Sequence, residues 1–130
     1  MNQTKYGYSK KVSFSFNEAI EKTKKELQEQ GFGVLTEIDV KSTLKKKIDV
    51  DFNDYVILGA CNPPNAYKSL QAEIEIGLLL PCNVIVYKKN DEVFVSAILP
   101  TIAMGMVDND SLKDIAINIE TKLKKVIDNI

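Results

Sequence analysis

One apolar stripe at the C-terminal end of the chain limits the possible folds more than any other feature of the sequence. Apolar side chains recur there at intervals of three and four residues over five turns, namely Leu112, Ile115, Ala116, Ile119, Leu123, Val126, Ile127 and Ile130. This period predicts an amphipathic α-helix, which Asn109 or Asp110 would cap. Because such a stripe must be buried against another element, the rest of the chain has to supply an apolar surface.

Five further segments carry the pattern of β-strands. The predicted strands cover residues 6–16, 32–40, 55–61, 77–88 and 93–99. The first alternates apolar and polar side chains, which is typical of a strand with one buried face. In the second, alternation is expected to place Phe32, Val34, Thr36 and Ile38 on one face and Leu35, Glu37 and Asp39 on the other. The turn KKND joins the last two segments into a hairpin, and Pro81 interrupts the fourth.

Three shorter helices are predicted between the strands, over residues 16–30, 40–48 and 63–73. Each follows a residue whose side chain can accept a hydrogen bond from the first-turn amides, namely Ser15, Asp39 and Asn62. Glu18 completes a capping box with Ser15, and Gly31 suits the left-handed end of that helix. Pro63 takes the first helical position, where its missing N–H is not needed.

The order of these elements predicts an α+β fold with an antiparallel sheet. The hairpin forces antiparallel pairing, and the long C-terminal helix must pack on one face of the sheet. Residues 55–58 and 84–87 are apolar on both faces, as in strands that are covered from both sides. Since one long helix covers one face, we expect the second face to be buried against another copy of the chain, in a homodimer. Residues 100–110 are expected to form a loop.

Composition excludes several classes of function. With 130 residues, 45% of them hydrophobic, the chain is expected to form a single domain, residues 1–130, around its own core. Histidine is absent, which excludes histidine acid–base catalysis, Ser-His-Asp and Cys-His triads and most zinc sites. All basic residues are lysine and the net charge is -1, so no nucleic-acid partner is expected. No apolar run suits a signal peptide or a membrane span, which predicts a cytoplasmic protein with reduced cysteines and no membrane partner.

The two cysteines are the residues most suited to chemistry. Cys61 directly precedes the predicted cap Asn62, and the positive end of a helix favours the reactive thiolate. The alternative is that Cys61 is a small buried apolar residue, as free cysteines often are. Cys82 lies in an apolar strand, so taken alone it is expected to be a buried residue of the core. The spacing C-x20-C is not that of a redox C-x-x-C motif and supplies only two soft ligands, so no metal site is expected.

Two more polar residues are candidates for the same site. Glu37 lies among apolar neighbours, where a carboxyl can be partly buried; the alternative is an edge position facing water or a partner for Lys41. Asn83 follows Cys82 and repeats the Cys-Asn pair of residues 61 and 62. The hypothesis is a polar pocket in an apolar sheet, lined by Glu37, Cys61, Asn62, Cys82 and Asn83.

Three motifs carry a resemblance to a known family. The stretches GFGVLTEIDV, ILGACNPPNAY and EIGLLLPCNVIVY, in this order and before an amphipathic C-terminal helix, resemble the small bacterial and archaeal proteins called domain of unknown function 302. The resemblance implies a curved antiparallel sheet like that of the TATA-box-binding protein, β-α-β4-α in outline, and a homodimer. It does not carry DNA binding with it. By motif match, Glu37, Cys61, Asn62, Pro63 and Cys82 belong to the family's signature, without an assigned role.

Four functions remain open at this point. The favoured hypothesis is a non-catalytic binding or regulatory homodimer that holds a small ligand in the pocket and needs no cofactor. The first alternative is a thiol-dependent redox protein or sensor, with Cys61 as the reactive thiolate and Cys82 as the resolving thiol. The second is a soft-metal or haem-related binding protein that uses thiolates. The third is a dimer in which the signature residues serve only the fold.

Overall fold

A five-stranded sheet is the centre of the fold. The structure, a computed structural model, describes residues 4–130. All strand pairs are antiparallel and the order across the sheet is β1-β5-β4-β3-β2. The strands are β1 (Gly7–Val12), β2 (Gly33–Asp39), β3 (Tyr55–Cys61), β4 (Cys82–Lys89) and β5 (Glu92–Ile98). The predicted α+β class with an antiparallel sheet is therefore confirmed; the closer likeness to the TATA-box-binding protein stays a prediction.

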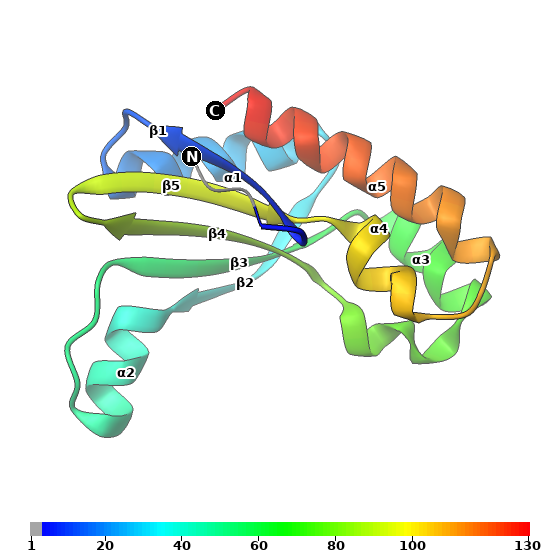
Figure 1. Cartoon of the computed structure of the whole chain (residues 1–130), viewed down its shortest axis with the longest axis horizontal. Coiled ribbons are helices and arrows are strands. Elements are labelled where there is room, and N and C mark those ends of the chain that lie inside the picture. Colours follow the sequence, from blue (N-terminus) through cyan, green and yellow to red (C-terminus); the bar gives the residue numbers. More distant parts are fainter. Residues whose placement is uncertain (1–3) are drawn as a thin grey trace.

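Helices lie on both sides of this sheet but cover only one side. The α-helices are α1 (Phe16–Glu29), α2 (Val40–Ile48), α3 (Pro63–Ala72), α4 (Pro100–Ala103) and α5 (Ser111–Asp128), and the 3-10 helices are η1 (Ile74–Leu79) and η2 (Met104–Met106). α1 and α5 lie side by side over one face of the sheet (Figure 1). α2 and η1 project from the opposite side, near opposite ends of the strands (Figure 1).

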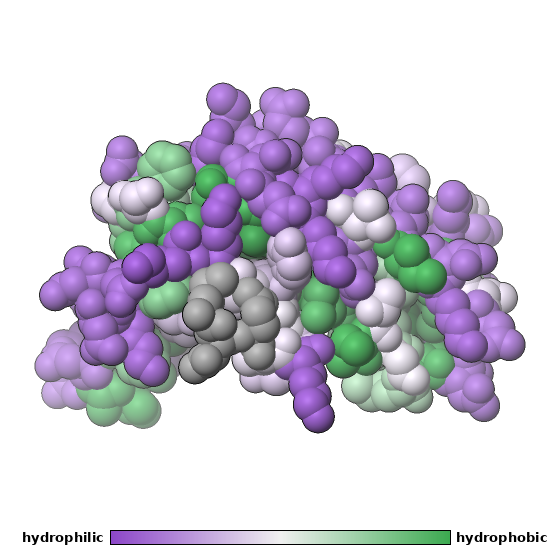
Figure 2. Space-filling view, turned by 45° about the horizontal axis from the view of Figure 1, so that its top comes forward, coloured by the Kyte–Doolittle hydropathy of each residue, from purple (hydrophilic) through white to green (hydrophobic). Residues whose placement is uncertain are grey.

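The core fills the space between the sheet and the pair α1 and α5. Alternate residues of the strands point into it, and the most deeply buried are Leu58, Val84, Val86, Val95 and Ala97. The apolar stripe of α5 meets them with Leu112, Ala116, Ile119, Leu123, Val126 and Ile127, all buried as the periodicity predicts. The outer side of the helical layer is largely hydrophilic (Figure 2). The C-terminal helix therefore packs as expected.

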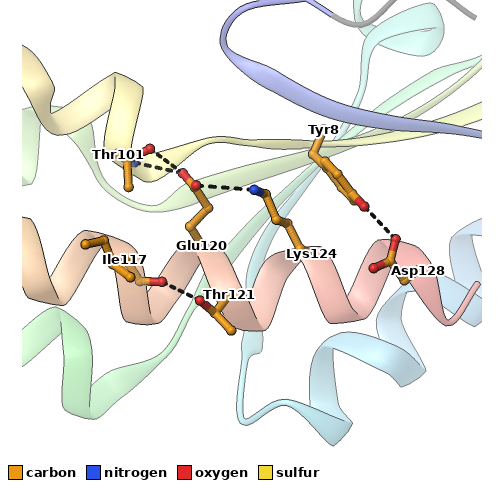
Figure 3. A network of polar contacts seen from close by, with 7 residues as sticks. All are labelled: Tyr8, Thr101, Ile117, Glu120, Thr121, Lys124 and Asp128. Carbon is orange, nitrogen blue, oxygen red and sulfur yellow. Dashed lines mark hydrogen bonds and ion pairs between the residues drawn. The ribbon is translucent and has the colours of Figure 1, made fainter.

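Polar contacts fix α5 to neighbouring elements near its middle and at its C-terminal end (Figure 3). Glu120 accepts hydrogen bonds from the Thr101 amide at 3.0 Å and from the Thr101 hydroxyl at 2.6 Å. Since α4 has no side-chain cap of its own, this carboxylate from α5 supplies the acceptor for its first turn. Near the C-terminal end of α5, the Tyr8 hydroxyl donates to Asp128 at 2.8 Å, and the Lys124 ammonium lies 5.5 Å from the centre of the Tyr8 ring.

The predicted helix starts agree with the structure. Ser15 and Glu18 form both hydrogen bonds of a capping box, and Gly31 after α1 has the positive φ of 80° that a left-handed end requires. The Asp39 carboxylate accepts from the Ser42 amide at 3.0 Å at the start of α2. At the start of α5, the residue that accepts is Asn109, from the Ser111 amide at 3.0 Å, while Asp110 makes no side-chain cap bond.

Four predictions about individual segments were wrong. The first strand covers only residues 7–12, and Phe14 beyond it is partly exposed. The fourth strand begins at Cys82, because the apolar run before it folds as η1 and reaches the sheet through Pro81. Residues 100–106 are helical rather than a loop, since Glu120 of α5 holds their first turn.

The fourth error concerns the two faces of β2. The register of β2 against β3 shifts between Val34 and Thr36, so the pairing skips Leu35. Such a bulge reverses the alternation of side chains that follow it. Thr36 therefore lies opposite Gly59 and no longer shares a face with Val34, which lies opposite Ala60.

The second face of the sheet, which we call the open face, is not covered by α1 and α5. Its strand residues are Gly7, Ser9, Lys11, Gly33, Thr36, Ile38, Tyr55, Ile57, Gly59, Cys61, Asn83, Ile85, Tyr87, Lys89, Glu92, Phe94, Ser96 and Ile98. Many of its apolar side chains are only half-buried, among them Tyr55, Ile57, Ile85, Tyr87 and Phe94. A Cβ on Gly59 would collide with the Thr36 hydroxyl and lie 2.9 Å from Cγ of Pro81, so this position requires glycine.

Candidate functional site

A cavity of about 310 Å³ lies where β2, β3 and β4 meet η1 and α3. It is lined by Phe32, Leu35, Ala60, Cys61, Asn62, Ala66, Leu70, Gly77, Leu80, Pro81, Cys82 and Ile119. Among these described residues none is charged, and Asn62 alone carries a side-chain nitrogen or oxygen. Pockets for small ligands are typically about 300–1,000 Å³ and mainly apolar with a few polar groups, so this cavity fits a small molecule.

Two irregular segments form its walls. The bulge in β2 takes Leu35 out of the ladder, and its side chain, 66% exposed, lies at the edge of the cavity. On the other side, η1 and the residues after it bring Gly77, Leu80 and Pro81 beside the first residue of β4. A regular strand over residues 77–81 would have filled this space with backbone, so the cavity depends on the 3-10 turn.

The cysteines reach the cavity from neighbouring strands. Cys82 of β4 pairs with Ala60 of β3, and Cys61 is the next residue along β3. The side chains of Cys61 and Cys82 therefore leave opposite faces of the sheet. Both are free thiols; Cys61 is half-buried and Cys82 is buried. Burial, and to a smaller extent the nearby Cys61, raises the pKa of the Cys82 thiol to about 11. Cys82 is therefore a neutral thiol at physiological pH, which disfavours a role as resolving nucleophile.

Asn62 holds the corner between β3 and α3. Its Oδ1 accepts from the Asn65 amide at 3.3 Å, which is the expected cap, and from Asn65 Nδ2 at 3.0 Å. Its own Nδ2 donates to the Gly31 carbonyl at 3.3 Å. Asn65 is buried and also donates to Asn118 Oδ1 on α5 at 3.0 Å. This network joins α3 to the end of α1 and to α5, so it fixes one side of the cavity.

The structure brings together three of the five predicted site residues. Cys61, Asn62 and Cys82 line the cavity, whereas Glu37 and Asn83 do not. Glu37 is exposed and pairs with Lys24 of α1, with 2.6 Å between Oε1 and Nζ, rather than with Lys41. The edge position that was considered as an alternative for Glu37 is therefore the one observed. Asn83 is exposed on the open face.

Sequence reasoning missed most of the residues that give the cavity its apolar character. Leu35, Gly77 and Leu80 were assigned to regular strands, in which they would not meet around one space. The bulge has no distinct signal in the sequence. The proline and glycine within residues 77–81 are signals of a break, and they could have suggested that the strand starts later.

Two further properties of the described residues bear on other functions. No group of three or more histidine, cysteine, aspartate or glutamate side chains converges within residues 4–130 as a metal site would require. No helix in this part of the chain is both long and apolar enough to cross a membrane.

Comparisons with known proteins point to one family. The family model of the domain of unknown function DUF302 matches residues 8–130. The crystal structure of an uncharacterized conserved DUF302 protein from Bacillus stearothermophilus matches with a TM-score of 0.91 and 35% sequence identity, over 97% of this chain and 98% of that chain. A comparison with curated proteins finds no significant match. The matches agree with the resemblance carried by the three sequence motifs.

Proposed function

The chain belongs to the DUF302 family, and from that premise and the cavity beside Cys61 we propose that it is a non-catalytic protein that binds a small, mainly apolar molecule. The observation that supports this proposal is the cavity itself, about 310 Å³ in volume, with two sulfur atoms and one amide in an otherwise hydrocarbon lining. An engineered apolar cavity of about 150 Å³ binds benzene, so a space twice as large suits a ligand of one or two rings.

The chemistry of the lining favours binding over reaction. The Asn62 side chain is engaged by Asn65 and Gly31, so it has little capacity left to activate a reactant. Cys82 stays protonated. Cys61 is the only other titratable side chain among the described residues that line the cavity. A ligand would gain free energy mainly by leaving water, at roughly 25 cal/mol per Å² of apolar surface.

A pair of glycines allows a matched test. A Cβ at Gly77 or at Gly105 meets no atom within 4 Å, so both positions accept a side chain, but Gly77 lines this cavity and Gly105 lines a different pocket. We expect indole and 1-octanol to shift NMR signals of the cavity residues in the wild type and in Gly105→Phe. The shifts should disappear in Gly77→Phe, whose ring occupies the space. Equal binding by Gly77→Phe, or no saturable shift in the wild type up to millimolar probe, contradicts the proposal.

A thiol-dependent redox function is a second candidate, supported by the position of Cys61 immediately before the α3 cap. The raised pKa of Cys82 opposes it, because the resolving partner would be a poor nucleophile. Its test is the rate at which iodoacetamide alkylates Cys61 at pH 7. A rate no higher than that of a free thiol excludes the redox function and leaves the binding proposal untouched.

A further inference from the structure

A second hollow of about 210 Å³ lies between the two short turns α4 and η2 on one side and the start of α5 on the other. We call it the α4–α5 groove. Of its lining residues, Met104, Leu112 and Ala116 are buried, whereas Gly105 and Ile117 are exposed, so the groove has an apolar floor and an open rim. Of the described residues, none lines both this groove and the ligand cavity, so the two are separate sites.

Polar side chains of the groove are already bound within the chain. The Thr101 hydroxyl donates to Glu120 at 2.6 Å, and Asn109 Nδ2 donates to the Ala72 carbonyl at 2.8 Å. These contacts fix the two walls and leave the apolar side chains as the surface that an occupant meets. An apolar cavity of about 150 Å³ holds benzene, so this groove has room for one large apolar side chain.

The apolar surface continues beyond the groove. Ile102 and Met106, on the same two turns as Met104, are 53% and 76% exposed, and Ile117 across the groove is 54% exposed. The outer side of the helical layer is otherwise largely hydrophilic (Figure 2). A small molecule in the groove would leave these side chains uncovered. An amphipathic helix presents several apolar side chains along one face, and flexible methionines adapt to such partners, so a helix suits this surface better.

Acidic residues border the apolar surface. Residues 108–114 contain three aspartates and one lysine, a net charge of -2, whereas the whole chain of 130 residues has a net charge of -1. The Lys113 ammonium lies 3.1 Å from a carboxylate oxygen of Asp110, so these two charges compensate each other. Asp108 and Asp114 are exposed, and Asp114 is three residues before Ile117 on the same side of α5. An apolar groove with this border is complementary to a segment that is apolar and positively charged.

We propose that the α4–α5 groove binds a basic amphipathic helix of another protein, with one large apolar side chain in the groove. Lysine or arginine side chains of the partner lie against Asp108 and Asp114, and its other apolar side chains cover Ile102 and Met106. Anionic lipid surfaces are repelled by the same carboxylates, which favours a protein partner. This interaction goes beyond the binding of a small ligand and uses none of the cavity residues.

A synthetic peptide tests the inference. The probe is a fluorescein-labelled peptide of about 18 residues, made of leucine and lysine with leucine at helical spacing; a second peptide has glutamate in place of lysine. We expect fluorescence anisotropy to give a Kd of about 10–100 µM for the basic peptide and no saturable binding of the acidic peptide. Because salt screens exposed charges, raising the ionic strength from about 0.01 M to about 1 M should weaken binding by roughly fivefold or more.

Two glycine variants locate the binding site. A Cβ at Gly105 or at Gly77 meets no atom within 4 Å, so both positions accept a side chain. Gly105→Phe fills the groove and should weaken peptide binding by about tenfold or more. Gly77→Phe fills the ligand cavity and should leave peptide binding unchanged. This pattern is the reverse of the one expected for indole, so the failure of one proposal is distinguishable from the failure of the other. Circular dichroism checks that both variants fold.

An exposed charge provides a test that does not depend on packing. Asp114→Lys reverses a charge beside the groove and should weaken binding of the basic peptide by roughly fivefold at low salt. Glu29→Lys makes the same change of charge at an exposed residue of α1 and is the matched control. It should change the Kd by about twofold at most, because its charge lies on another element.

Several results would overturn the inference. The first is no saturable binding of the basic peptide up to about 1 mM. The others are equal binding by Gly105→Phe, equal binding of the acidic peptide, or equal effects of Asp114→Lys and Glu29→Lys. Light scattering and phosphatidylcholine vesicles reveal other occupants. A dimer that Gly105→Phe converts to a monomer assigns the groove to a second copy, and vesicle binding that Gly105→Phe abolishes assigns it to a lipid surface; either result contradicts a basic helix as the partner.

Discussion

Replacing Asn62 by alanine should destabilise the protein, because this side chain links the first turn of α3 to Gly31 after α1, beside the cavity. The change removes the cap of α3, whose loss typically costs about 1 kcal/mol. It also removes the hydrogen bond from Asn62 Nδ2 to the Gly31 carbonyl, worth about 1 kcal/mol. Asn65 loses one acceptor but keeps Asn118, so it is not left without a partner. We expect the free energy of unfolding to fall by about 2 kcal/mol, which lowers the Tm by about 6–10 °C.

Two further variants separate the contributions. Asn62→Asp keeps an acceptor at the N-cap, where the helix dipole favours negative charge, but loses the donor to Gly31. It should lose about half as much stability as Asn62→Ala. Asn83→Ala is the matched control from the second Cys-Asn pair: Asn83 is exposed and its side chain makes no hydrogen bond to the described residues 4–130, so the loss should stay within about 0.5 kcal/mol.

Urea unfolding followed by circular dichroism measures these differences, with equal slopes required for a direct comparison of the midpoints. The reasoning is refuted if Asn62→Ala unfolds within about 0.3 kcal/mol of the wild type. It is also refuted if Asn83→Ala is as destabilising as Asn62→Ala, since the effect would then not come from the network at the corner.

Three other changes test neighbouring parts of the structure. Stability that depends on the neutral thiol of Cys82 should be fully present below pH 9 and lost as the pH rises towards about 11, so urea midpoints measured from pH 8 to 11 should fall more steeply in the wild type than in Cys82→Ala. Glu37→Gln removes the half-exposed ion pair with Lys24 and should cost at most about 1 kcal/mol in urea unfolding, with indole binding unchanged in NMR titrations. Gly59→Ala should lower the unfolding free energy by about 1–3 kcal/mol, and calorimetry should show partial recovery when Thr36→Ala removes the colliding hydroxyl.

Local signals in the sequence predicted the regular elements well. Capping needs only residues three positions apart, so Ser15 with Glu18, and Asn62 with Pro63, indicated where α1 and α3 begin. The stripe of α5 has the helical period throughout, and its burial followed from amphipathicity. These features depend on short stretches of chain, which is why one sequence is sufficient to find them.

The candidate site was predicted only in part, because its walls depend on contacts between distant segments. Cys61 and Asn62 were placed correctly since they sit at a strand end followed by a cap. The opposite wall depends on where residues 74–81 leave the sheet, and an apolar run of that length suits a strand as well as a helical turn. The apolar neighbours of Glu37 in the sequence predicted that it lies in the site. Its ion-pair partner, Lys24, is thirteen positions away on another element, so the sequence around Glu37 does not reveal this contact.

Two interruptions of regular strand pairing explain why the cavity lies at this end of β3. In a sheet with unbroken pairing, β4 would continue beside β3 as far as Cys61, as β2 does through Gly33, and cross-strand neighbours would fill both faces there. The bulge at Leu35 shifts the register on one side of β3, and η1 delays the start of β4 on the other. Both irregularities thus change the cross-strand neighbours of the same strand end. The cavity is the result of these two interruptions, so a variant that restores regular pairing on either side should close it even with both cysteines unchanged.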